Sequence, residues 1–211
     1  MKVNLIIFDL DGTILDTIYD IHKAIVETVK FYGFPTFDME TTKKYVGDGI
    51  RKLVERAVGK GNFRDEHENF FRSFYRDHIV DNTKLFDGIS ELLLGLRESN
   101  NEVVILSNKS FDMTDYLVRY FHLDRFASLW YGGDSFQEKK PSPLPAKMIM
   151  SIKGVDSDST IIVGDNYTDI ECGFNAGVKT IYCKYGYGKL SDVKPDYIAE
   201  SPIDIKRILG V

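Results

Sequence analysis

The chain has 211 residues and a net charge of −5, with 43% hydrophobic and 28% charged residues. This length suffices for one sizeable α/β core and a smaller additional unit, and the acidic balance argues against a broad surface for nucleic acid or for an anionic membrane. No apolar stretch reaches the length of a membrane span, and Met1-Lys2-Val3 leads directly into a strand pattern rather than a signal peptide. We therefore expect a cytoplasmic protein, either a monomer or a homodimer.

The two cysteines, Cys172 and Cys183, are too few for a disulfide framework, and their spacing does not fit a pair of metal ligands. Two reduced structural cysteines are typical of a cytoplasmic protein. We expect no chemistry from either thiol.

Apolar runs with strand character recur along the chain and are separated by segments with helical periodicity. The runs cover residues 4–8, 103–106, 160–163 and 179–183, and helical patterns cover, for example, residues 89–96 and 114–121. Strands that alternate with helices are typical of βαβ units. The pattern predicts an α/β fold with a Rossmann-like parallel sheet core and helices on both faces.

The segment between the first and second strands is too long for an ordinary βα connection. It shows helical spacing of apolar residues from Ile18 onward, and further helices are plausible at residues 39–46, 50–58 and 64–80. This predicts an all-helical subdomain inserted at residues 16–82, so that the core comprises residues 1–15 and 83–211. The core of the insertion is expected to contain four aromatic residues: Phe70, Phe71, Phe74 and Tyr75.

Polar residues suited to phosphate chemistry follow the apolar runs. Asp9 and Asp11 follow the first run, Ser107 follows the second, and Asp165 follows the third, while Lys140 lies between the latter two. Open parallel sheets bind ligands beyond the carboxyl ends of their strands, so these residues are expected to meet in one crevice. Two carboxylates just past a buried strand need a compensating cation. The sequence therefore indicates a metal-assisted site.

The segment DLDGTILD at residues 9–16 resembles the first motif of the haloacid dehalogenase-like phosphatase superfamily. The other motifs match in order: SNK at residues 107–109, KPSP at residues 140–143, and GDNYTD at residues 164–169. The resemblance covers nearly the whole chain, and the helical insertion matches the cap domain of that family.

The resemblance implies an Mg²⁺ site and an aspartyl-phosphate intermediate. Asp9 would be the nucleophile and a metal ligand, and the backbone carbonyl of Asp11 and the side chain of Asp165 would be further ligands. Asp169 would support the metal or its waters. The carboxyl of Asp11 would lie away from the metal, because it would first protonate the leaving alkoxide and then activate water.

The resemblance also implies a phosphate-binding set. Ser107 and Lys140 would hold the phosphoryl oxygens by hydrogen bond and charge, and Asn108 is expected to bind phosphate beside them. The lysine is expected to be Lys140 rather than its neighbour Lys139, because of its spacing to the prolines that follow. Gly12 would let the backbone approach the phosphate closely.

Two features bear on the choice of substrate. Related dehalogenases and phosphonoacetaldehyde hydrolases generally lack an acid at the position of Asp11, and related sugar phosphomutases usually carry an apolar residue at the position of Thr13. The insertion segment that contains Gly47, Gly49 and Arg51 resembles the substrate loop of phosphoglycolate phosphatases. Arg51 or its neighbour Lys52 would then meet a substrate carboxylate, although a solvated helix face explains either residue equally well.

The sequence thus predicts an Mg²⁺-dependent phosphatase acting on a small phosphorylated metabolite, with 2-phosphoglycolate as the best candidate. Two alternatives stay open. One is a sugar phosphomutase similar to β-phosphoglucomutase, and the other is a non-catalytic module that binds phosphate.

Overall fold

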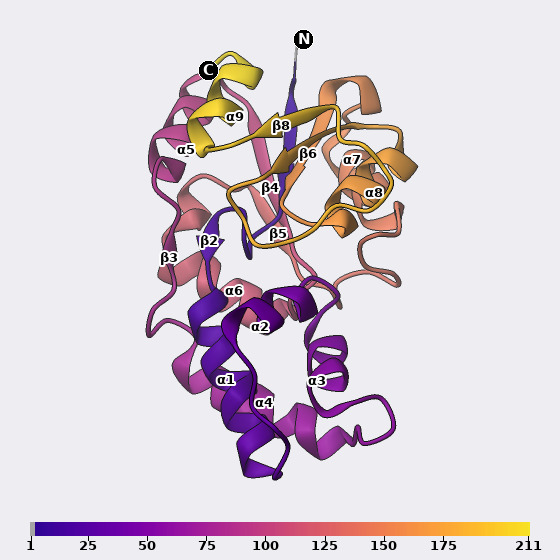
Figure 1. The fold of residues 1–211 in the computed structure, drawn as a ribbon. Coiled ribbons are helices and arrows are strands. Elements are labelled where there is room, and N and C mark those ends of the chain that lie inside the picture. Colours follow the sequence, from indigo (N-terminus) through magenta and orange to yellow (C-terminus); the bar gives the residue numbers. More distant parts are fainter. Residues whose placement is uncertain (1–2) are drawn as a thin grey trace.

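The computed structural model describes residues 3–211. Within them, six parallel strands form one sheet in the order β5-β4-β1-β6-β7-β8 (Figure 1). These strands are β1 (Leu5–Phe8), β4 (Glu102–Leu106), β5 (Leu129–Tyr131), β6 (Thr160–Gly164), β7 (Lys179–Cys183) and β8 (Tyr197–Ala199). No helix among the described residues is long and apolar enough to cross a membrane.

Strand β1 lies in the middle of the sheet, where both of its faces are covered. All four of its residues are buried, and Ile6 pairs with Val103 of β4 and with Ile161 of β6. A parallel strand that is buried on both faces consists of consecutive apolar residues. This explains why a continuous apolar run marks β1 in the sequence.

Helices pack against both faces of the sheet. The side chains of α5, α6 and α9 join one apolar cluster with alternate strand residues such as Ile6 and Phe8, whereas those of α7 and α8 join a second cluster with Leu5 and Ile7. The bounds are Ile89–Glu98 for α5, Phe111–Tyr120 for α6, Leu144–Lys153 for α7, Tyr167–Ala176 for α8 and Pro202–Leu209 for α9. Two short 3₁₀ helices lie at Leu123–Arg125 and Ser157–Ser159.

The α/β fold predicted from the sequence is therefore confirmed. The strands predicted at residues 4–8, 103–106, 160–163 and 179–183 are present within one residue at each end. The sequence analysis missed β5 and β8, because each is a three-residue edge strand whose residues are only partly buried in the main. Short, half-covered strands carry too few consecutive apolar residues to stand out.

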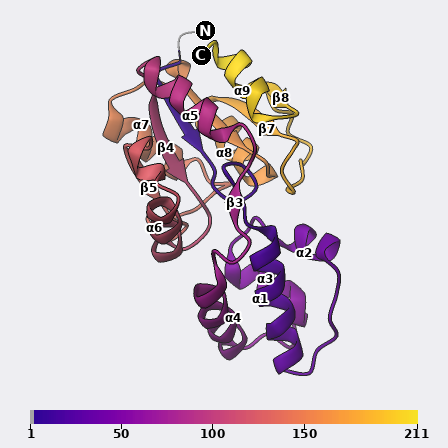
Figure 2. The same cartoon turned by 90° about the vertical axis from the view of Figure 1, so that its left-hand side faces the viewer.

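Four helices lie beyond the carboxyl end of the sheet, as Figures 1 and 2 show: α1 (Ile18–Phe31), α2 (Met39–Tyr45), α3 (Ile50–Val58) and α4 (Asp65–His78). They join the sheet through β2 (Leu15–Asp16) and β3 (Lys84–Leu85), which pair antiparallel. Asp16 therefore belongs to this two-stranded ribbon. The boundaries of an inserted domain at residues 16–82 stay a prediction.

The aromatic residues of α4 divide into two kinds. Phe71 and Tyr75 are fully buried, as expected for a core, whereas Phe70 and Phe74 are only half-buried. Phe70 stacks on the exposed ring of Phe31, with ring centroids 4.4 Å apart. Phe74 packs against the apolar cluster that contains Phe71 and Tyr75, so three of the four residues meet the expectation, whereas Phe70 lies outside that cluster.

Asp20 of α1 connects the helical part to the chain that returns to the sheet. Its fully buried carboxylate accepts hydrogen bonds from the backbone N–H groups of Asn82 and Thr83, at 2.8–3.0 Å. It also accepts from the Asn82 amide and the Thr83 hydroxyl, at 2.9 and 2.8 Å. These contacts hold the segment through which the chain returns from the helical part to the sheet.

We expect Asp20→Ala to lower the free energy of unfolding by about 2–4 kcal/mol, because it leaves the buried N–H and hydroxyl groups of Thr83 without their acceptor and also removes the bonds from Asn82. Urea denaturation followed by circular dichroism measures this change. Asp77→Ala is the matched control, since Asp77 is exposed on α4, and its effect should stay within about 0.5 kcal/mol. Equal effects of the two substitutions would contradict the role of Asp20.

Candidate active site

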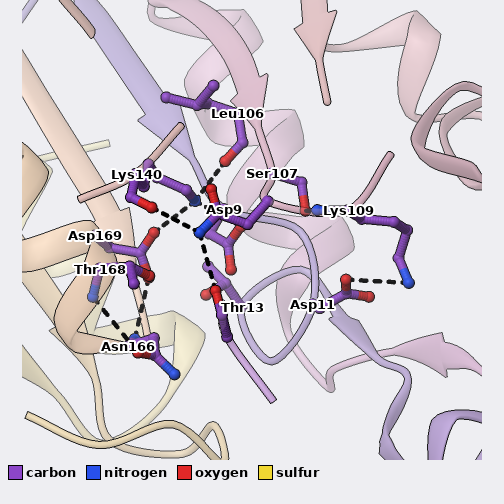
Figure 3. A network of polar contacts seen from close by, with 12 residues as sticks. Asp9, Asp11, Thr13, Leu106, Ser107, Lys109, Lys140, Asn166, Thr168 and Asp169 are labelled. Atoms are coloured by element: carbon purple, nitrogen blue, oxygen red, sulfur yellow. Dashed lines mark hydrogen bonds and ion pairs between the residues drawn. The ribbon is translucent and has the colours of Figure 1, made fainter. Parts of the chain in front are cut away.

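The carboxyl ends of three neighbouring strands bring the predicted site residues together. Asp9 follows β1, Ser107 follows β4, and Asp165 follows β6. Lys140 arrives from the loop before α7, and Asp169 lies in the first turn of α8. Figure 3 shows Asp9, Ser107, Lys140 and Asp169 around one point. The crevice expected from the parallel sheet is thus present.

Three buried carboxylates, those of Asp9, Asp165 and Asp169, form a compact cluster with one lysine. One oxygen from each carboxylate lies within 4.8 Å of the others. The Lys140 Nζ donates to Asp9 Oδ1 at 2.8 Å, to Asp169 Oδ1 at 2.6 Å and to the backbone oxygen of Leu106 at 2.6 Å. All three ammonium protons of Lys140 are therefore used within the protein.

One lysine does not balance three carboxylates, and the pKa values show the deficit. Burial, together with the neighbouring Asp169, raises the pKa of Asp9 to about 7 despite the opposing charge of Lys140. Burial and the charges of Asp9 and Asp169 raise the pKa of Asp165 well above its usual value. A second cation would remove both penalties. Clustered carboxylate oxygens are donors suited to a hard divalent ion such as Mg²⁺, so the residues present fit that cofactor.

The chain holds Asp165 in place from two sides. Its Oδ2 accepts from the backbone N–H groups of Tyr187 and Gly188, at 3.0 and 2.7 Å. Gly12 lies against the same carboxylate with φ +82°, and a Cβ there would collide with it. The glycine is thus required by its conformation and by the close approach of Asp165. Its predicted contact with phosphate stays a prediction.

A second polar group lies on the other side of Asp9, around Asp11. The Asp11 Oδ2 pairs with the Lys109 Nζ at 3.2 Å, and Oδ1 accepts from the Thr17 hydroxyl at 2.8 Å. The Lys109 Nζ also donates to the Tyr75 hydroxyl at 2.9 Å. Because Thr17 gives its proton to Asp11, the Tyr187 hydroxyl, 2.7 Å away, must donate to Thr17. The Asp11 carboxyl therefore lies apart from the acidic cluster.

These groups face one cavity between the sheet and the helices. Its polar wall includes Asp9, Asp11, Ser107, Lys109 and Lys140. Its apolar wall comes from the helical part and is formed by Ile21, Val46, Ile50, Leu53 and Phe71, with Tyr75 beside them. The cavity is thus shared between the two parts of the molecule.

The cap loop, which we define as residues 47–49, covers this cavity and is tied to the core. The Gly47 oxygen accepts from the Asn108 amide at 2.9 Å, and the Asp48 oxygen accepts from the Lys139 Nζ at 2.6 Å. The Asp48 carboxylate also accepts from the Tyr167 hydroxyl. Gly47 and Gly49 both line the cavity, in agreement with their predicted position. The described arrangement is therefore closed over the site.

Arg51 does not lie where the sequence analysis placed it. Its side chain is exposed, pairs with Asp65 at 3.1 Å and Glu68 at 3.4 Å, and stacks over Phe63. Neither Arg51 nor Lys52 lines the cavity. The first residues of α3 turn Ile50 and Leu53 inward, so the residues between them point outward. The alternative interpretation, a solvated helix face, describes both residues.

Asn108 lines the cavity, and its contact with phosphate stays a prediction. Both protons of its amide are donated to backbone oxygens, those of Gly47 and Lys140, each at 2.9 Å. In this arrangement the side chain therefore has no donor left for phosphate, and it connects the cap loop to the lysine loop instead. Ser107 is buried and lines the cavity, with its hydroxyl accepting from the backbone N–H of Lys109 at 3.2 Å. Lys139 is exposed and lies outside the cavity.

Lys109 and Tyr75 line the cavity, although the sequence analysis gave neither residue a role in the site. Lys109 belongs to the quoted SNK motif but was given no role, and Tyr75 was assigned to an apolar core. The signal for Lys109 is its place three residues beyond the end of β4, two residues after Ser107. No sequence signal separates Tyr75 from Phe71 of α4, because both rings are fully buried and only the Tyr75 hydroxyl reaches Lys109.

The protein is a capped α/β enzyme. Its parallel sheet carries acidic residues at the strand ends, helices cover them, and the one buried lysine of the cluster does not balance their charge. The model of the haloacid dehalogenase-like hydrolases matches residues 6–183. The chain belongs to this family.

Curated and solved relatives agree with this assignment. The chain is 35% identical to the phosphoglycolate phosphatase of Aquifex aeolicus strain VF5 over 207 residues, which cover 98% of this chain and 97% of that protein. It is 33% identical to the phosphoglycolate phosphatase of Chromobacterium violaceum, covering 94% and 93%. The crystal structure of a protein from Haemophilus somnus 129PT, described as a predicted phosphoglycolate phosphatase, superimposes with a TM-score of 0.90 at 25% identity, covering 99% and 98%. The chain is thus a phosphoric monoester hydrolase of this family.

Proposed function

We propose that this protein is an Mg²⁺-dependent phosphatase that hydrolyses 2-phosphoglycolate through an aspartyl-phosphate on Asp9. The observation that carries the proposal is the cluster of Asp9, Asp165 and Asp169 around the ammonium of Lys140, at the carboxyl ends of β1 and β6. The substrate follows from the relatives, of which those at 35% and 33% identity are phosphoglycolate phosphatases.

Asp9, Asp165 and Asp169 would hold the ion. Bound Mg²⁺ would supply positive charge that lets a carboxylate approach an anionic ester. The Oδ1 of Asp9 is bonded to Lys140, which leaves Oδ2 free to attack phosphorus. Lys140 keeps Asp9 and Asp169 in place and offsets part of their charge. Ser107, on the neighbouring strand, is in a position to donate to a phosphoryl oxygen.

Asp11 would move the protons of both half-reactions. In the first, it gives a proton to the alkoxide of the leaving glycolate as the Asp9–phosphorus bond forms. In the second, it takes a proton from the water that attacks the phosphoryl group and releases inorganic phosphate. Its separation from the acidic cluster and its bond to Thr17 suit this role, because the carboxyl must change protonation state without binding the cation.

The test is phosphate release from a panel of small monoesters that includes 2-phosphoglycolate, a hexose phosphate and ethyl phosphate. We expect 2-phosphoglycolate to have the highest kcat/KM, by at least about tenfold, because its leaving group is short and its carboxylate can pair with a lysine of the cavity lining, where Lys109 and Lys140 lie. Comparable kcat/KM values across the panel would exclude 2-phosphoglycolate as the specific substrate but would still show phosphatase activity. A requirement for a sugar bisphosphate, with little net phosphate release, would identify a phosphomutase instead.

A further inference from the structure

The cavity contains two cationic side chains among the described residues that line it, Lys109 and Lys140. Lys140 already binds three acceptors within the protein. Lys109 has two, Asp11 and the Tyr75 hydroxyl, although an ammonium group has three protons. Of the two cations, Lys109 therefore has a donor left for a ligand.

The position of Lys109 places that donor away from the acidic cluster. Figure 3 shows Lys140 beside Asp169 on one side of Asp9 and the Lys109–Asp11 pair on the other. Asp11 would contact the ester oxygen of a bound monoester, so Lys109 lies on the side of the leaving group rather than of the phosphoryl group. Lys109 is 6% exposed and is held by β4 and α4 together, through its place after the strand and its bond to Tyr75.

The wall that the helical part contributes to the cavity is mostly apolar. Ile21, Ile50, Leu53 and Phe71 line it, and the hydroxyl groups of a sugar would lose their water there without gaining partners. A negative group next to Lys109 would have an ionic partner, whereas neutral hydroxyls against the apolar wall would have none. These features favour a short leaving group that ends in one anion.

We propose that the Lys109 ammonium, positioned by Tyr75, binds the carboxylate of the substrate and makes the enzyme selective for short phosphorylated carboxylic acids. This inference rests on the proposed phosphatase function. It assigns to Lys109 the recognition of the substrate carboxylate that Arg51 or Lys52 was expected to provide. A charge-assisted hydrogen bond in a buried site is strong and disfavours substrates that leave the ammonium unpaired.

The experiment compares 2-phosphoglycolate with ethyl phosphate, which has the same CH₂–O–phosphate linkage but no carboxylate. For Lys109→Met we expect the ratio of the two kcat/KM values to fall by about tenfold to a hundredfold, with most of the change in the KM for 2-phosphoglycolate. Lys109→Gln, which keeps a donor for Tyr75, should lower the ratio similarly. Arg51→Met is the matched control, and its ratio should stay within about twofold of the wild-type value, since Arg51 lies outside the cavity.

The ratio separates recognition from an indirect effect through Asp11. If Lys109 served only to position Asp11, both substrates would lose activity equally, and an unchanged ratio in the two folded variants would overturn the proposal. A lower ratio in Arg51→Met and not in Lys109→Met would overturn it as well. Wild-type protein that hydrolyses ethyl phosphate without preferring 2-phosphoglycolate would refute the inference and the proposed substrate but not the phosphatase activity, whereas hydrolysis of neither ester would refute the phosphatase activity too.

Discussion

Asp9→Asn should lower kcat by at least about a thousandfold, because a neutral carboxamide cannot attack phosphorus to form an acyl phosphate. The variant should nevertheless fold. Burial disfavours the charge of Asp9 and raises its pKa to about 7, so that an uncharged side chain of the same shape removes a cost. The Lys140 Nζ keeps an oxygen acceptor at the same position.

Phosphate release from 2-phosphoglycolate measures the loss of kcat, and a thermal melt measures whether the variant folds. Asp87→Asn is the matched control, because Asp87 is exposed in the loop before α5, and it should keep near-wild-type kcat. If Asp9→Asn retained more than about a tenth of the wild-type kcat, Asp9 would not be the nucleophile.

Removal of Mg²⁺ should lower activity by a similar factor. With a chelator present, we expect kcat/KM for 2-phosphoglycolate to fall at least about a thousandfold, because uncompensated carboxylates repel the anionic ester. Addition of Mg²⁺ should restore activity and should also raise the melting temperature, a readout that does not depend on turnover. Asp165→Asn should weaken both responses. Full activity in chelator would exclude the metal-assisted mechanism.

The raised pKa of Asp9 gives the Mg²⁺ response a defined pH dependence. Between about pH 4 and pH 7 Asp9 is protonated in the folded, metal-free protein but ionised in the unfolded chain, so the stability of the metal-free protein should fall as the pH rises through this range. Mg²⁺ needs the ionised carboxylate. Its affinity should therefore drop by about tenfold per pH unit below about pH 7, and titrations of melting temperature at several pH values measure this. A flat profile would contradict the pKa assigned to Asp9.

The features that the sequence predicted correctly depend on residues that are close together in the chain. The run from residue 4 to residue 8 predicted a buried central strand, because every side chain on such a strand must be apolar. Asp9, Asp11, Ser107 and Asp165 were found because each lies within three residues of the end of such a run, and the topology of a parallel sheet brings its strand ends together.

Only the tertiary structure decided which side chains face the cavity from the helical part. Arg51 and Tyr75 both lie on amphipathic helices, and the packing of these helices against their helical neighbours turns Arg51 outward and brings the Tyr75 hydroxyl to Lys109. Asn108 is diverted to the cap loop by a carbonyl 61 positions away in the chain. Sequence periodicity reports that a side chain is buried but not which atom it contacts, because that contact depends on how separate elements pack.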